Sequence, residues 1–377
     1  PATVNMADTL AVTTLAPHGA TGTLLVDPNN YTVAASGGNA TGASFTSLIN
    51  SNNVTISTAS YGTAGGSGDI FINDTITKTA ASGTTSLTFL AERNIAVNSS
   101  ITSTGGPLNI TLSAANAAAG TLGGVRVASS QTLNSNGGDI LIGGAGGSVS
   151  GAQTPSHGIG YALNYSSSQE AVSIGSSANI LSRGGNITIN GNSTQRGGGS
   201  SDTTAVHIGA SAVIDSGYYA PGATDASSGG FINISGKYTG GVGTNADKVF
   251  GVKIDNPSGN AGQTTLAAST TTGSIRIEGS STYDTPGSYA LNMATNGLAG
   301  NIYFNAYSVA DLIFILNGDL KGVSFTYSPP TSGCRTGYPN CGLLSVNASA
   351  NNSYLYATYN AVNMATLPIY VSATLSG

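Results

Sequence analysis

Gly184-Gly185-Asn186-Ile187-Thr188-Ile189 decides the fold, because this phrase returns along most of the chain. Each copy has one or two glycines, often Asp or Asn, and then alternating apolar residues. Glycine accepts a positive φ and lets the chain turn sharply, and the alternation that follows is that of a half-buried β-strand. The phrase therefore predicts a repeating turn and strand, as in a solenoid. The other copies are residues 68–72, 137–142, 229–234, 273–277 and 300–304.

A second strand type lies between the glycine phrases, with a polar residue between two aliphatic ones. We expect Arg126, His207 and Lys253, the central residues of three such triplets, to face water while their neighbours stack inside. The triplets are residues 125–127, 172–174, 206–208, 252–254 and 291–293.

The spacing of the two strand types indicates the size of the repeat. Ile187 and Ile232 begin equivalent strands, and a triplet falls between them. We therefore expect a pair of coils of about 20 to 25 residues each as the unit. About fifteen coils, about 4.8 Å apart, would make a rod on the order of 70 Å long. No segment shows helical periodicity with caps, so we expect very little α-helix.

The composition favours one long repeat domain with an uncharged surface. Charged residues make up 7% of the 377 residues and hydrophobic residues 39%, and the net charge is −5. The eleven Lys and Arg residues do not cluster, which argues against nucleic-acid binding. The longest apolar stretch is far shorter than a membrane helix, so we expect no membrane insertion. A surface rich in Gly, Ser, Thr and Asn suits contact with sugars, matrix or another copy of the chain.

The predicted fold class is all-β, a parallel β-helix, in three regions. Residues 1–60 form an N-terminal β segment with the first coils, and residues 61–305 form the repeats. Residues 306–377 are rich in tyrosine and lack the glycine phrase, which predicts a distinct C-terminal β region acting as a cap or a junction with a neighbour. Because the chain opens without Met or a signal core, we expect a mature chain or part of a larger one.

Two cysteines, Cys334 and Cys341, lie in a segment rich in turn-forming residues. This spacing favours a small disulfide-closed loop over two free thiols, and a disulfide would place the protein outside the cytoplasm. We expect no metal site and no cofactor, since no further Cys exists and the three His residues are scattered along the sequence.

The first 115 residues or so resemble filamentous-haemagglutinin-like exoproteins of Gram-negative bacteria. The resemblance rests on residues 14–28, 53–57, 68–76 and 87–98, in that order and spacing, and it continues more loosely to about residue 305. It implies a right-handed parallel β-helix and a secreted or surface-bound adhesive fibre. Family members are usually far longer and begin with a secretion domain marked by a short Asn-Pro-Asn-containing motif, which is missing from this sequence, so the resemblance implies an interior piece or a processed subunit.

Catalytic signals are weak. The chain has three Glu residues, and its Asp residues lie mostly in turns; we expect equivalent turn positions for Asp69 and Asp139, with roles in backbone hydrogen bonding. We interpret His207 as an outward strand residue and predict a protein that is not an enzyme. Twelve Asn-x-Ser/Thr sequons occur, and composition alone would produce several of them. Some exoproteins of the resembled family are glycosylated at such sites, and the candidates here are Asn73, Asn98, Asn186, Asn192 and Asn233.

The sequence thus favours a non-enzymatic extracellular β-solenoid, a surface fibre or a biofilm-matrix filament subunit. Its partners would be itself, stacked head to tail into a homopolymer, or neighbouring repeats of a larger exoprotein, with host or matrix glycans as further partners. A polysaccharide-active enzyme on the same fold, lyase or hydrolase, and a carbohydrate-binding module are the alternatives. The first would need acidic residues from adjacent coils to converge, and the second a row of aromatic residues along one groove.

Overall fold

The computed structural model describes most of the chain, with gaps in the loops. From residue 280 onward the description is of the backbone. The described residues are 3–15, 18–58, 68–81, 83–115, 122–145, 160–165, 170–194, 203–218, 228–240, 249–255, 264–267, 274–281, 289–295, 297–308, 311–317, 320–328, 344–351, 355–359 and 369–376.

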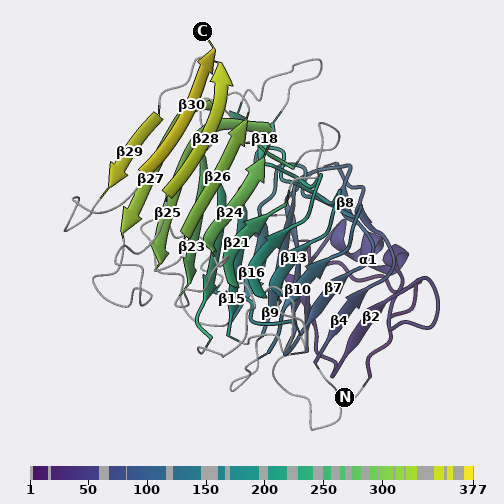
Figure 1. Ribbon diagram of the computed structural model, residues 1–377. Coiled ribbons are helices and arrows are strands. Elements are labelled where there is room, and N and C mark those ends of the chain that lie inside the picture. The colour runs from purple at the N-terminus through teal and green to yellow at the C-terminus, as the bar shows by residue number, and fades with distance from the viewer. Residues whose placement is uncertain are drawn as a thin grey trace.

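Three parallel sheets wind around one core and make a β-helix, as the sequence predicts (Figure 1). Each coil gives one strand to sheet A and the next to sheet B, and most coils give a third to sheet C. Sheet B contains eleven strands, so the described coils span about 50 Å at about 4.8 Å per coil. The rod is therefore shorter than the expected 70 Å.

Sheet A contains the strands of five of the six glycine phrases. Its members, in spatial order, are β1 (Thr23–Val26), β3 (Asn53–Ser57), β6 (Thr85–Leu90), β9 (Leu108–Ala114), β12 (Ile140–Gly144), β15 (Ile187–Ser193), β20 (Ile232–Tyr238), β23 (Ser274–Ser281), β25 (Gly297–Ser308), β27 (Leu320–Ser328) and β29 (Leu355–Tyr359).

Sheet B contains the predicted triplets, and their register is confirmed. Val125, Val172, Val206, Val252 and Leu291 pair in one column. The strands are β2 (Tyr31–Val33), β4 (Ile70–Ile72), β7 (Ile95–Val97), β10 (Val125–Val127), β13 (Glu170–Ile174), β16 (Thr203–Ile208), β21 (Val249–Ile254), β24 (Tyr289–Thr295), β26 (Asp311–Asn317), β28 (Leu344–Asn351) and β30 (Ile369–Ser376).

Sheet C is a third face, whose strands the sequence pattern does not reveal. Its strands are short, and at several positions one aliphatic residue, such as Leu133 or Ile180, is all that points inward. The next inward position holds a serine in four coils, and Ser135 Oγ donates to the carbonyl of Gly138, 2.5 Å away. The members are β5 (Ile76–Lys78), β8 (Ile101–Ser103), β11 (Thr132–Asn134), β14 (Asn179–Leu181), β17 (Val213–Asp215), β22 (Thr265–Ala267) and the first residues of β25, and a separate hairpin joins β18 (Gly217–Tyr218) to β19 (Ser228–Gly229).

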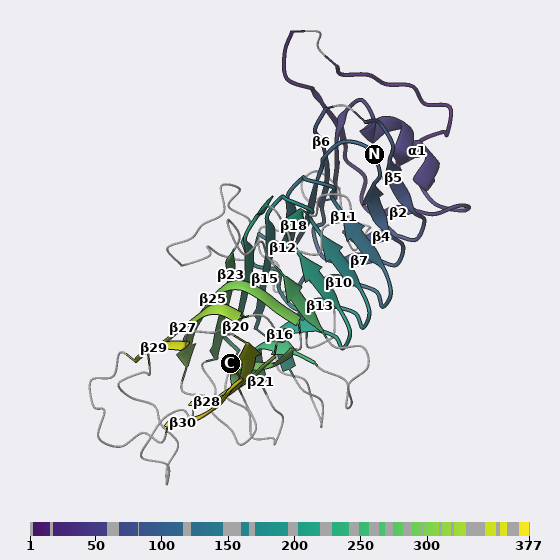
Figure 2. The same ribbon diagram turned by 90° about the horizontal axis from the view of Figure 1, so that it is seen from above.

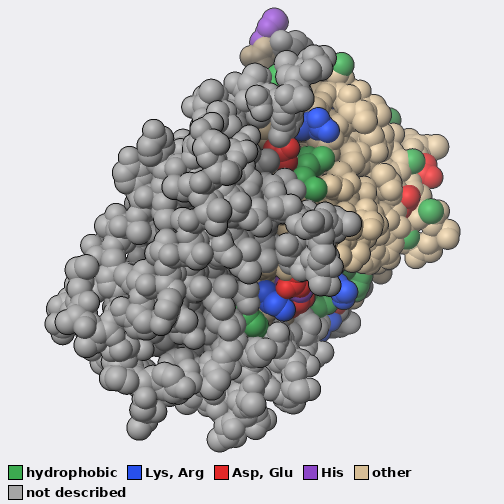
Figure 3. Space-filling view, turned by 45° about the horizontal axis from the view of Figure 1, so that its top comes forward, with side chains coloured by type: hydrophobic (Ala, Val, Ile, Leu, Met, Phe, Trp, Pro, Cys, Tyr) green, Lys and Arg blue, Asp and Glu red, His purple; other side chains and the backbone are tan. Residues whose placement is uncertain are grey.

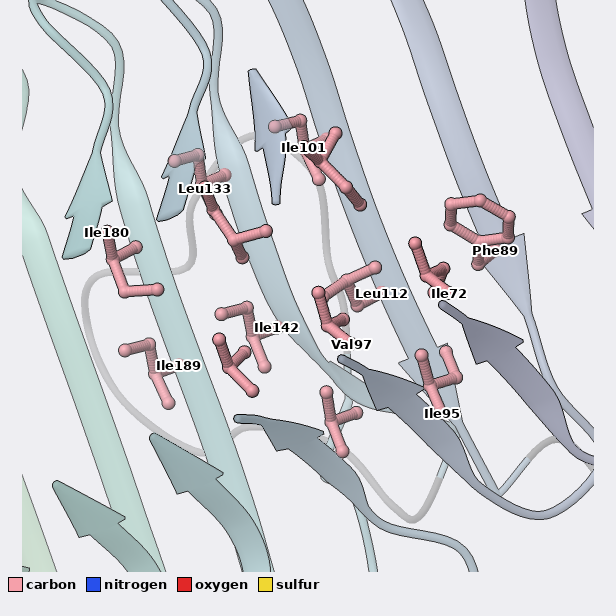
Figure 4. Close-up of a cluster of buried hydrophobic side chains, with 14 of the residues drawn as sticks. Ile72, Phe89, Ile95, Val97, Ile101, Leu112, Leu133, Ile142, Ile180 and Ile189 are labelled. Atoms are coloured by element: carbon pink, nitrogen blue, oxygen red, sulfur yellow. The ribbon is translucent and has the colours of Figure 1, made fainter. Parts of the chain in front are cut away.

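Aliphatic columns from the three sheets meet in one continuous core. Figure 4 shows Leu112, Ile142 and Ile189 of sheet A facing Val97 of sheet B, with Leu133 of sheet C beside them. All five side chains are fully buried. Burial of a side chain of this size stabilises by about 1.5–3 kcal/mol, so the columns supply the main driving force for stacking.

The coil size predicted from the sequence is wrong for the middle of the chain, although Ile70 and Ile95, 25 residues apart, enclose one coil of the predicted size. Ile187 and Ile232 are direct register partners, so the residues between them form one coil with one strand in each sheet, and not a pair of coils. The prediction failed because the sheet C strands carry too little alternation to be seen.

The glycine phrase at residues 68–72 leads into a strand of sheet B, and not of sheet A as the other phrases do. Ile70 pairs with Tyr31 and Ile95 in sheet B, whereas Ile140 and Ile187 pair in sheet A. The turn positions of Asp69 and Asp139 are therefore not equivalent, although both carboxylates bind backbone N–H groups.

A short helix, α1 (Gly42–Ile49), was not predicted. Thr41 caps it by accepting a hydrogen bond from the N–H of Ser44, and Phe45, Leu48 and Ile49 give it a buried face. The helix follows β2 and precedes β3, so it takes the place of the sheet C strand in the first coil. Figure 2 shows it at the N-terminal end of the rod, with β29 and β30 at the other end.

Sheets A and B continue past the predicted boundary at residue 305, whereas sheet C, among the described strands, ends at the first residues of β25. Sheet A continues from β25 into β27 and β29, and sheet B continues through β28 to β30, always in parallel. Cys334 and Cys341 lie outside the described residues.

The second glycine of the repeated pair is required by the close approach of successive coils. A Cβ atom on Gly185 would lie 2.0 Å from the carbonyl oxygen of Gly138, and a Cβ on Gly230 would lie 2.2 Å from that of Gly185. Any larger residue would push neighbouring coils apart.

We therefore expect Gly185→Ala to lower the free energy of unfolding by about 1–3 kcal/mol, because the added methyl meets backbone that cannot move away. Urea unfolding monitored by circular dichroism measures this. Ser129→Ala, an exposed residue, is the control and should be neutral. Equal stability of the two variants would contradict the close-approach explanation.

Candidate functional site

The outward column of sheet B brings together a histidine and two carboxylates. Ser173, His207 and Lys253 are register partners on β13, β16 and β21, and all three point outward as predicted for this strand type. What the sequence did not reveal is that Glu170 and Asp255, 37 and 48 residues away from His207, flank its ring. Figure 3 shows acidic and basic side chains lying beside one another in small groups on the coloured part of the surface.

Both ring nitrogens of His207 contact a carboxylate. Nδ1 lies 2.5 Å from Glu170 Oε1, and Nε2 lies 2.7 Å from Asp255 Oδ2. Lys253 Nζ lies 3.5 Å from the other oxygen of Asp255. The side chain of His207 is 22% exposed. The cluster therefore ties three successive coils together through charge-assisted hydrogen bonds.

The surroundings hold His207 in its charged form. Burial opposes the charge, but hydrogen bonds and attraction from Asp255 and Glu170 outweigh it and raise the pKa of His207 to about 9. Burial acts against the charge of Glu170 too, but His207, Ser173 and Arg126 lower its pKa. The hydrogen bond from His207 lowers the pKa of Asp255, with help from Lys253.

This arrangement does not resemble a nucleophilic triad. An imidazolium that donates both N–H groups to carboxylates has no free nitrogen to accept a proton. Ser173 bonds to Glu170, so its hydroxyl does not face an imidazole base. The cluster links neighbouring coils through ion pairs.

A second polar cluster lies on the outward side of sheet A. Tyr161 Oη and Ser235 Oγ are 3.1 Å apart, and Lys237 Nζ lies 4.1 Å from the centre of the Tyr161 ring. Arg276 Nη2 lies 3.4 Å from Glu278 Oε2. Burial lowers the pKa of Lys237 and raises those of Tyr161 and Glu278, so desolvation dominates here.

Asp and Asn at the strand starts form ladders along the rod. In sheet A, Asp139 Oδ1 accepts from the N–H of Asn186, 2.8 Å away, and Asn186 Oδ1 accepts from the N–H of Phe231, 3.1 Å away. In sheet B, Asp69 Oδ1 accepts from the N–H of Asn94. Asp69 also forms a bidentate ion pair with Arg93. The predicted backbone role of Asp69 and Asp139 is confirmed.

The five candidate sequons differ in accessibility. Asn73 and Asn98 are exposed and hydrogen-bond to each other. Asn186 is held by its ladder and Asn233 is half-buried, whereas Asn192 is 9% exposed and accepts from Thr239. Only the first two asparagines present a free surface to a modifying enzyme.

Within the described ranges, no group of three or more His, Cys, Asp and Glu side chains has the arrangement of a metal site. In the same ranges, no helix is long and apolar enough to cross a membrane. Comparison with known proteins finds no matching family model, no matching curated protein and no matching solved structure.

The His207 cluster predicts a pH-dependent stability. A folded pKa of about 9 against an ordinary 6.5 means that the stabilisation is complete below about pH 6.5 and is lost as pH rises through about 9. Acidification removes it too, because the pKa values of Glu170 and Asp255 are lowered in the folded chain.

We expect His207→Gln to cost about 1–2 kcal/mol below pH 6.5, after allowance for partial exposure, and to flatten the alkaline part of the profile. Urea unfolding at low salt measures both effects. His18→Gln, the same substitution at an exposed histidine outside the cluster, is the control. An unchanged profile in His207→Gln would show that the imidazolium contributes no stability.

Proposed function

We propose that the chain is a non-enzymatic structural unit of an extracellular adhesive fibre or biofilm matrix. The observation that carries the proposal is the continuity of the core, whose columns run without interruption from β1 to β23 across the described side chains. A body of this kind grows in length with each coil while its thickness stays fixed. A long body of constant thickness is suited to a fibre that spans the distance between two surfaces.

The polar groups support the same function. The Asx ladders and the His207 cluster bind one coil to the next, and few of their atoms are left to meet a substrate. The resemblance of the first 115 residues to filamentous-haemagglutinin-like exoproteins adds support for an adhesive role outside the cell. The exposed Asn73 and Asn98 are the positions at which we would expect glycosylation.

Negative-stain electron microscopy across a concentration range, with and without reductant, tests the proposal. We expect thin unbranched fibres that lengthen with concentration, because β-helix ends carry strand edges able to pair. A sensitivity to reductant would implicate Cys334 and Cys341. Globular particles, or turnover of polysaccharides by the purified chain, would contradict a structural role.

Glycan binding is a second candidate, favoured by the sheet A cluster. Lys237 and Arg276 provide positive charge on the same face, above the buried ring of Tyr161. Uronate-containing oligosaccharides match these groups, since their carboxylates can pair with the two cations.

If the sheet A cluster binds such sugars, Lys237→Ala should weaken binding at least tenfold, as measured by calorimetry. Arg126→Ala, which removes a charge from sheet B, should leave the affinity unchanged. Equal effects of the two substitutions would indicate nonspecific electrostatic attraction and exclude a site on sheet A.

A further inference from the structure

The N-terminal end of the rod is closed on two of its three faces by the chain itself. On the sheet C face, α1 covers β5: Thr77 N–H donates to Thr46 Oγ1 at 3.2 Å, and the N–H groups of Thr79 and Ala80 donate to Asn50 Oδ1 at 2.9 and 2.8 Å. The backbone groups that a further strand would need are therefore already bonded.

The sheet B face is closed by the turn that follows β2. Thr32 N–H donates to Asn39 Oδ1 at 2.8 Å, and the carbonyl of Thr32 accepts from Asn39 N–H at 2.7 Å. Ala34 N–H donates to the carbonyl of Ala40. A second chain cannot pair with β2 without displacing this turn.

The sheet A face is open. Successive residues of a strand direct their backbone N–H and C=O groups to opposite sides. Asn53 N–H donates to the carbonyl of Gly22, so the backbone groups of Leu24 point toward β3. Those of Thr23 and Leu25 therefore point away from β3. Among the described residues, no hydrogen bond involves the N–H or C=O of Thr23 or Leu25. The strand β1 thus presents an unpaired edge.

A large apolar side chain stands on this edge strand. Leu25 is 62% exposed, and it is one of four exposed large hydrophobic residues in the described part of the chain. In the outward column of sheet A, Leu25 is followed by Thr55, Thr88 and Thr111. The next three coils carry threonine at this position, so the leucine adds apolar surface whose burial by another chain would be favourable.

The far end of sheet A has the matching edge. β29 pairs with β27 through the register Val323 to Leu355 and Ser324 to Tyr356, and no described strand follows it in the sheet. The same alternation directs the backbone groups of Leu355 away from β27. Leu355 stands at the same register position of the repeat as Leu24, and Tyr356 at that of Leu25.

We propose that the open edge of β1 binds β29 of a second copy of this chain, in parallel, so that sheet A continues from one copy into the next. Leu24 would follow Leu355, and Leu25 would follow Tyr356, in the register of sheet A. The proposal deepens the proposed fibre function and rests on it. It assigns the joint to one sheet, with sheets B and C interrupted by the turn and by α1.

Two features favour a second copy over an unrelated strand. The donors and acceptors of the two edges follow one alternation, and the equivalent register positions on the two edges, Leu24 and Leu355, are both leucines. The net charge is −5 over 377 residues, so electrostatic repulsion between stacked copies is weak.

Substitution at the edge tests the proposal on the full chain. Leu25→Lys should abolish fibres seen by electron microscopy and leave monomers in analytical ultracentrifugation, because a charge is placed in the joint. Thr111→Lys puts the same charge in the same column three strands inside the sheet and should leave fibres intact. Circular dichroism should show that both variants are folded.

Mixing sharpens the test. A tenth part of Leu25→Lys added to the unsubstituted chain should shorten fibres several-fold, because its intact β29 edge still binds and then blocks further growth. Leu25→Cys mixed with Tyr356→Cys should give a 25-to-356 disulfide, found by mass spectrometry, since neighbouring parallel residues lie within bridging distance.

Fibres that persist in Leu25→Lys, or a joint that cross-links between positions 32 and 370 of sheet B, would overturn the proposed joint and leave the fibre function standing. An unsubstituted chain that stays monomeric at every concentration would overturn both.

Discussion

The structure depends on the close parallel stacking of one coil on the next. Backbone ladders set the spacing, and the small spacing requires glycine where the chain crosses between coils, as at Gly138, Gly185 and Gly230. Once that contact is made, the inward residues of each sheet fall into columns and bury one another. The glycine pairs and the aliphatic alternation are therefore two parts of one requirement.

Polar residues serve the same contact. Asn and Asp at the strand starts accept from backbone N–H groups one coil away, and Glu170, His207 and Asp255 connect three coils through their side chains. A chain with few charges has used several of them to fix the register of its own coils. This leaves a largely uncharged outer surface, suited to contact with other surfaces.

The sequence revealed the fold because the strands of sheets A and B repeat a strong local signal. It did not reveal sheet C, where Leu133 or Ile180 alone faces the core, and so it misjudged the coil length. It missed α1, although Phe45, Leu48 and Ile49 have helical spacing after a capping Thr41, because the segment is only eight residues long. The partners of His207 could not be predicted, since only the winding of the chain places Glu170 and Asp255 beside it.

The asymmetry of the two ends gives the rod a direction, with α1 and a turn closing most of one end and strand edges at the other.

Fibre diffraction from an oriented specimen tests the account most directly. Stacked coils predict a reflection near 4.8 Å on the meridian and an axial repeat of about 50 Å, one chain of eleven strands. A 4.8 Å reflection on the equator, or the absence of that axial repeat, would contradict it.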